Sequence, residues 1–147
     1  MALAYANATS GERALGEIQK ILRGFGCSKF GSMIDDDAGT VLVQFEHRGK
    51  RVQVEASMKG YAAAWLKDKP YTHRMQKTRV QHERKAMDVA SVAVYSILRD
   101  WIKGQVTAIE TGILSFEGAF LGQILLENGK TVMEHTTASG LLKLPKS

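Results

Sequence analysis

Seven lysine and arginine side chains fall close together in the middle of the chain, where they could bind phosphate groups. Only Asp68 and Glu83 oppose them in that stretch, and the seven are Lys67, Lys69, Arg74, Lys77, Arg79, Arg84 and Lys85. Cationic side chains at this density neutralise backbone phosphates and release counterions, so binding would depend on salt. Tyr71 and Tyr95 could add stacking on a base. The alternative interpretation is a surface helix whose outer face is simply solvated by charge, and the sequence does not decide between the two.

A run of three aspartates, Asp35 to Asp37, could offer carboxylate oxygens to a divalent cation. Together with Glu46 and Lys50, this turn is faintly similar to the Asp…Glu-x-Lys pattern of metal-dependent nucleases. The spacing does not match that pattern, because Glu46 and Lys50 are separated by three residues rather than one. We therefore favour a structural turn over a magnesium-dependent nuclease site built on Asp36, Glu46 and Lys50.

Other catalytic or metal-binding patterns are missing from the sequence. The four histidines form no i, i+4 pair and Cys27 is the single cysteine, so we expect no zinc site. The sequence contains no Walker loop, no Gly-x-Ser-x-Gly and no dinucleotide fingerprint. We expect no cofactor, and a non-enzymatic protein is favoured over an enzyme.

Length and charge set the broad class. A chain of 147 residues with 44% hydrophobic and 24% charged residues suits one globular domain. Residues 59–104 hold ten Lys/Arg against four Asp/Glu, which accounts for the whole net charge of +5 and favours a polyanionic partner. With a lone cysteine, no recognisable signal peptide and no apolar run that spans a membrane, we expect a cytoplasmic protein.

The basic stretch itself predicts a long helix from Thr72, its expected N-cap, to Lys103. This helix either ends at Gly104 or continues to about Thr111. Its expected core face carries Val80, Met87, Ala90, Val94, Ile97, Leu98 and Trp101. The opposite face would form a positive stripe, with Asp88 and Tyr95 between its members; these are Arg74, Lys77, Gln81, Arg84, Lys85, Arg99 and Lys103.

The residues before this helix predict a capped first helix and a small sheet. Thr9 and Glu12 form a capping-box pattern, and an apolar face follows at Leu15, Ile18, Leu22 and Phe25. Residues 29–34 suggest a strand, and residues 40–57 predict a β-hairpin around Arg48-Gly49. In that register Phe45 lies opposite Val52, Val43 opposite Val54 and Val41 opposite Ala56. A short helix follows at residues 59–67.

After the long helix we expect a helix that begins near Ser115 and a final short helix capped by Thr131 and Glu134. The predicted fold is α+β: a small antiparallel hairpin or three-stranded sheet packed on an N-terminal helix and a long central helix, with C-terminal helices. Residues 1–8 would form a flexible arm, residues 9–140 a single domain and residues 141–147 a tail. A homodimer through the long helix is also expected, because its apolar face exceeds what three strands readily cover.

The runs VLVQFEHRGKRVQVEA, KGYAAAWLKDKP and ERKAMDVASVAVYSILRDWIKGQVTAIETGILSFEGAFL give the chain an overall texture that resembles small basic proteins encoded by tailed bacteriophages. That resemblance implies a setting rich in small DNA-handling proteins and in small inhibitors of host machinery, and it carries no catalytic residues. Our first functional hypothesis is a nucleic-acid-binding accessory protein, with DNA favoured over RNA. The alternative is an interaction protein that binds a host protein and needs no affinity for DNA.

Overall fold

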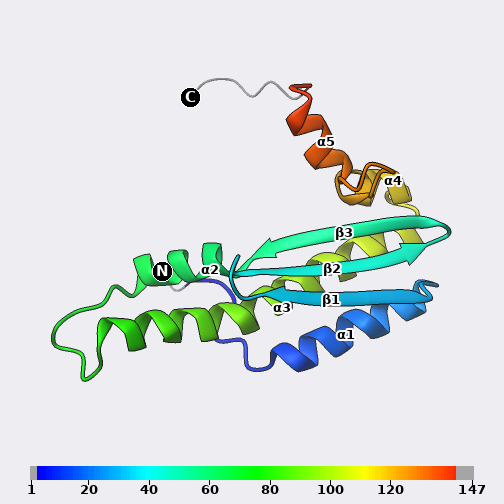
Figure 1. Ribbon diagram of the computed structural model, residues 1–147. Helices are drawn as coiled ribbons and strands as arrows, with labels where there is room; N and C mark the ends of the chain where they lie inside the picture. Colours follow the sequence, from blue (N-terminus) through cyan, green and yellow to red (C-terminus); the bar gives the residue numbers. More distant parts are fainter. Residues whose placement is uncertain (1–2, 142–147) are drawn as a thin grey trace.

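The three strands form an antiparallel meander in the order β1–β2–β3, with β1 at Lys29–Asp35, β2 at Thr40–His47 and β3 at Lys50–Ser57. The computed structural model describes residues 3–141 and shows this sheet lying against a layer of helices (Figure 1). The helices are α1 (Gly11–Gly24), α2 (Met58–Asp68), α3 (Arg79–Glu110), α4 (Phe116–Phe120) and α5 (Val132–Ala138), with a 3₁₀ turn η1 (Leu121–Gln123). The predicted α+β fold is confirmed.

The β2–β3 hairpin has the register that its sequence predicts. Phe45 lies opposite Val52 and Val41 opposite Ala56, which places the apolar side chains on the face toward the helices. Arg48 has φ +50° and Gly49 has φ +80°, so the two-residue loop is a type I′ turn. This turn type matches the right-handed twist of the strands, which explains why the loop needs no further residues.

The helix layer is built around α3. α1 and α3 run in the same direction. Gly11, at the start of α1, lies against Tyr95 of α3. Farther along α1, Glu17 forms an ion pair with Arg99, which is one turn beyond Tyr95 on α3. α2 packs on the first half of α3, and the sheet covers the middle. The core consists of completely or almost completely buried side chains from all of these elements, including Ile18, Leu22, Val41, Val43, Phe45, Val52, Trp65, Leu98, Ile102 and Phe120.

The predicted start of the long helix is wrong. α3 begins at Arg79 rather than after Thr72, because Thr78 accepts a hydrogen bond from the Gln81 amide and the Gln81 side chain accepts one from the Thr78 amide. At its other end α3 runs through Gly104 to Glu110, which is the longer of the two expected alternatives.

The predicted core face of the long helix is also only partly correct. Val80 is 64% exposed, whereas the predicted Ala90 is buried, together with His82, Ala86 and Ala93, which the prediction did not include. The physical reason is that this half of α3 packs against α2, where small alanine side chains allow close approach. A buried helix face made of alanines is hard to recognise in the sequence, because alanine is also common on exposed helix faces.

The first helix is capped one residue later than predicted. Ser10, not Thr9, accepts the hydrogen bond from the Arg13 amide at 3.1 Å, so the Thr9–Glu12 capping box does not form. The expected apolar face is present, with Ile18 and Leu22 completely buried. Gly26, at φ +96°, provides the left-handed turn that leads out of α1 toward β1.

The C-terminal helices begin where their sequence predicts. Ser115 caps α4, and Thr131 with Glu134 forms the capping box of α5. Between them, Ile124 bridges to Val52 and the Leu125 amide donates to the Arg51 carbonyl at 2.8 Å, so this segment lies along the outer edge of β3. Figure 1 shows α5 pointing away from the sheet.

Hydrogen bonds to α2 and α3 hold the N-terminal segment against the helices. Within the predicted arm, Tyr5 donates a hydrogen bond to Asp100 at 2.6 Å, and the Ala4 carbonyl accepts one from Tyr61 at 2.5 Å. Most of the predicted tail, residues 142–147, lies outside the described residues. In the described part of the chain, no helix is long and apolar enough to cross a membrane.

Two glycine substitutions separate backbone strain from helix propensity. Gly49→Ala will lower the free energy of unfolding by about 1–2 kcal/mol, because alanine disfavours the left-handed conformation. Gly104→Ala will raise it by about 0.5–1 kcal/mol, since Gly104 lies inside α3 and a methyl group meets no atom there. Urea titration measures both. Equal effects of the two variants would contradict the assigned turn.

Candidate functional site

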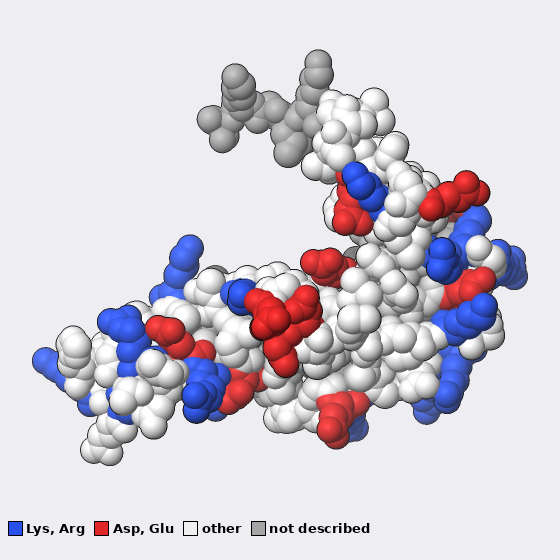
Figure 2. All heavy atoms as spheres, in the orientation of Figure 1, with Lys and Arg blue, Asp and Glu red and all other residues white. Residues whose placement is uncertain are grey.

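The seven basic residues lie around the far end of a helical hairpin formed by α2, the connection of residues 69–78 and the start of α3. Figure 1 shows this hairpin reaching beyond the end of the sheet, and Figure 2 shows lysine and arginine side chains spread over its end. We call this surface the basic tip. Six of its members are exposed and Lys77 is half-buried; the members are Lys67, Lys69, Arg74, Lys77, Arg79, Arg84 and Lys85.

The basic tip differs from the predicted stripe. Arg74 and Lys77 belong to the connection before α3, so they do not continue a helical face. Arg99, farther along α3, is half-buried and occupied by ion pairs with Glu17 and Asp100. The prediction of one positive stripe along the helix is therefore wrong, and the charge is concentrated at one end of the hairpin.

The charges of the basic tip have no anionic partner within the described part of the chain. Among residues 3–141, none of the seven side chains forms an ion pair. Asp68 and Glu83 are the acidic residues of the same stretch. Exposed cations that are not neutralised by neighbouring carboxylates are available to an external anion.

Aromatic rings hold part of the basic tip in place. The guanidinium group of Arg79 lies 5.1 Å from the centre of the Tyr71 ring, and the Lys69 ammonium lies 5.6 Å from that of Trp65. The Tyr71 hydroxyl donates to the Lys77 carbonyl at 2.8 Å, which closes the connection on itself. Tyr71 is thus engaged within the tip, and Tyr95 is buried, so the predicted stacking of Tyr95 on a base is wrong.

His82 joins the two arms of the hairpin, a role that the sequence did not reveal. It is only 2% exposed, and its Nε2–H donates to the Lys69 carbonyl at 2.7 Å. Its ring centre lies 5.1 Å from that of Trp65 on α2. The sequence does contain one indication of this role: His82 has helical spacing from Ala86, Ala90 and Ala93, which places it on the same helix face as these small buried residues.

The predicted acidic turn does not assemble a metal site. Asp36 follows β1 at one end of the sheet, whereas Glu46 and Lys50 lie at the other end, beside the β2–β3 turn. There Glu46 pairs with Lys29 and Lys50 with Glu117. Within residues 3–141, no group of three or more His, Cys, Asp or Glu side chains could hold a metal ion.

A second buried histidine lies at the opposite end of the molecule from the basic tip. His47 is stacked on Phe25, with ring centres 4.0 Å apart, and on Phe116, at 5.2 Å. Burial, together with the nearby charges of Arg48 and Lys50, lowers the pKa of His47 below its ordinary value of 6.5. Cys27 is also buried, and burial raises the pKa of its thiol to about 11, so this cysteine is not a nucleophile at neutral pH.

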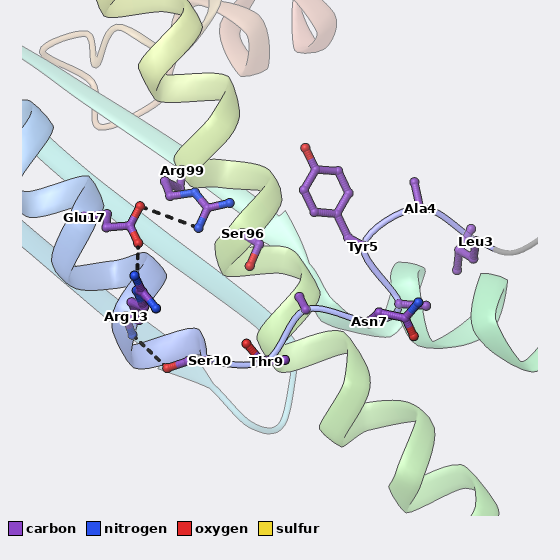
Figure 3. A pocket seen from close by; sticks show the side chains of 12 residues that line it. Leu3, Ala4, Tyr5, Asn7, Thr9, Ser10, Arg13, Glu17, Ser96 and Arg99 are labelled. Atoms are coloured by element: carbon purple, nitrogen blue, oxygen red, sulfur yellow. Dashed lines mark hydrogen bonds and ion pairs between the residues drawn. The ribbon is translucent and has the colours of Figure 1, made fainter.

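A cleft of about 610 Å³ lies between residues 3–10, α1 and α3. Figure 3 shows Arg13 and Arg99 both directed at Glu17, at 3.5 and 3.6 Å. A hydrogen bond from Arg99, and a second from Tyr5, hold the pKa of Asp100 below its ordinary value. The charges around this cleft are matched within the chain, in contrast to those of the basic tip.

Comparison with known proteins assigns no family to the chain. No family model, no curated protein and no solved structure matches it. The geometry and charge of the surface therefore carry the functional argument.

His82→Ala will lower the free energy of unfolding by about 2–4 kcal/mol, because it leaves a cavity beside Trp65 and removes the partner of the Lys69 carbonyl. The matched control is His73→Ala, an exposed histidine of the same connection, which will change stability by less than about 0.5 kcal/mol. Urea denaturation compares the two. A similar small effect of both variants would show that His82 does not join the hairpin.

The lowered pKa of His47 predicts a pH dependence of stability. Between its folded pKa and its unfolded value of 6.5, the unfolded chain binds more protons, so the free energy of unfolding falls as the pH falls through this window. His47→Phe keeps a stacked ring and removes the titration, so its stability will change less over the same window. Thermal melts at several pH values measure this. His73→Phe serves as the control and will keep the wild-type dependence.

Proposed function

We propose that this protein binds nucleic acid, with DNA as the favoured ligand, through the basic tip and without catalysis. The observation that carries the proposal is the clustering of seven lysine and arginine side chains, unpaired within residues 3–141, at one projecting end of the molecule. Nucleic acids supply the matching partner, because their phosphates form a dense line of negative charge.

Four of these residues are assigned to direct phosphate contacts: Arg74, Lys77, Arg84 and Lys85. Lys67, Lys69 and Arg79 extend the positive field around them. The rings beneath Lys69 and Arg79 limit the motion of those two side chains, which reduces the entropy lost when a phosphate binds.

The same surface argues for binding without strong sequence preference. Base edges are read by side chains with bidentate hydrogen-bonding groups on an element that enters a groove. Gln81, the candidate on this part of α3, already uses its side chain to cap the helix at Thr78. A convex tip rich in lysine and arginine instead suits contacts to phosphates, which carry no direct sequence information.

Removal of the four contact charges tests the site. Arg74, Lys77, Arg84 and Lys85 are replaced together by glutamine, and binding to labelled duplex DNA is followed by fluorescence anisotropy across a salt series. Each lost phosphate contact lowers the slope of log K against log salt by about 0.9, so the slope will fall by about three to four units.

The control variant removes the same number of charges elsewhere. Four exposed side chains outside the basic tip are replaced by glutamine, namely Lys20, Arg23, Arg51 and Lys130. The slope of log K against log salt will then stay close to that of the wild-type protein. An unchanged slope in the tip variant would refute the site. Failure of the folded wild-type protein to bind DNA at low salt would refute the function and direct the search to an acidic protein surface.

A further inference from the structure

Among residues 3–141, no strand pairs with the outer edge of β1. β2 occupies one side of this strand, and six of its seven residues are exposed. Two of these are large apolar side chains, Met33 at 64% and Ile34 at 50% exposure. At the other edge of the sheet, Ile124 and Leu125 lie along β3. The unpaired amide and carbonyl groups of an exposed edge form a template for another strand.

We propose that β1 pairs antiparallel with β1 of a second copy of this chain, about a two-fold axis at Ser32. In this register Lys29 lies opposite Asp35 of the second copy, and the symmetry repeats this ion pair at the other end of the strand. Phe30 lies opposite Ile34 of the second copy on the face toward the helices, and Gly31 lies opposite Met33 on the other face. The strand is therefore complementary to itself in both charge and apolar contact.

The register follows from the length and alternation of the strand. Centring the pair on Gly31 or Met33 also keeps the two apolar faces on one side, but it leaves five paired residues instead of seven and separates Phe30 from Ile34. Only the arrangement centred on Ser32 pairs the whole strand. It also shields part of Ile34, which the helices of its own chain leave half exposed.

The charged side chains at the two ends of β1 are compatible with this pairing. Lys29 contacts Glu46 on β2 at 3.2 Å, and its side chain remains 76% exposed, so it can also reach a carboxylate across the new interface. Asp35 accepts a hydrogen bond from the Ala38 amide through Oδ1. Its second oxygen, Oδ2, is available for Lys29 of the second copy.

The apolar face of α3, where we first expected a dimer, is covered within one chain by α1, α2 and the sheet. Pairing through β1 instead joins two sheets into one of six strands with all helices on the same side. The basic tip projects from the Asp35 end of β1 (Figure 1), so the two-fold axis places the two tips at opposite ends of the dimer.

A charge-exchange experiment tests this interface. In Lys29→Glu homodimers the introduced glutamate would face Asp35, and in Asp35→Lys homodimers the introduced lysine would face Lys29, so both ion pairs become repulsive in each variant. Each variant alone will show a dimer dissociation constant raised by about tenfold or more. Mixing the two in equal amounts makes both pairs attractive again, so a mixed dimer will form with near-wild-type affinity.

Light scattering after size exclusion, over a range of concentrations, measures the mass of each sample, and circular dichroism verifies that each variant is folded. Lys103→Glu and Asp88→Lys make the same charge changes on the exposed part of α3 and will leave the dimer intact, alone or mixed. A wild-type protein that stays monomeric at millimolar concentration would overturn the proposal. Dimers that persist in both single variants, or that fail to return in the mixture, would overturn it as well.

Discussion

The mismatch between the length of α3 and the length of the sheet determines the rest of the structure. A helix of 32 residues is about 48 Å long, whereas strands of eight residues span about 27 Å. The sheet and α1 cover the middle of α3, but its first turns extend beyond them. α2, which precedes α3 in the chain, packs alongside this extension and covers Ala86 and Ala90, so the two helices project together. The basic tip exists because this projection must end in a connection exposed to solvent.

A projection of two helices needs internal contacts to keep a fixed shape, and the described residues supply them through aromatic and histidine side chains. His82 bonds to the end of α2 and lies against Trp65, while Tyr71 closes the connection onto Lys77. These contacts are largely buried, and the charged ends of Lys69 and Arg79 lie over the Trp65 and Tyr71 rings. The proposed binding surface is thus held by packing beneath it, and its cations remain free of ion pairs among the described residues.

The sequence predicted those parts of the structure that local chemistry controls. Period-two alternation determined the register of Phe45 with Val52, and capping patterns located the starts of α4 and α5. The start of α3 was missed because Thr72 and Thr78 are both suitable N-cap residues. The feature that distinguishes them is Gln81, which follows Thr78 by three residues and completes a capping box, whereas Thr72 has no such partner. The buried role of His82 was missed because it arises from contact with α2. For the candidate site, the seven residues could be named in advance, but not their division between helix and connection.

Acetylation of lysines with a small reagent tests whether nucleic acid contacts the basic tip. The folded protein is labelled with and without excess duplex DNA, and mass spectrometry measures the modification of each lysine. We expect DNA to protect Lys67, Lys69, Lys77 and Lys85, while the exposed Lys20, Lys103 and Lys130 react as they do without DNA. If bound DNA changed the modification of no lysine, or protected Lys20, Lys103 and Lys130 instead, the basic tip would not be the surface that contacts DNA.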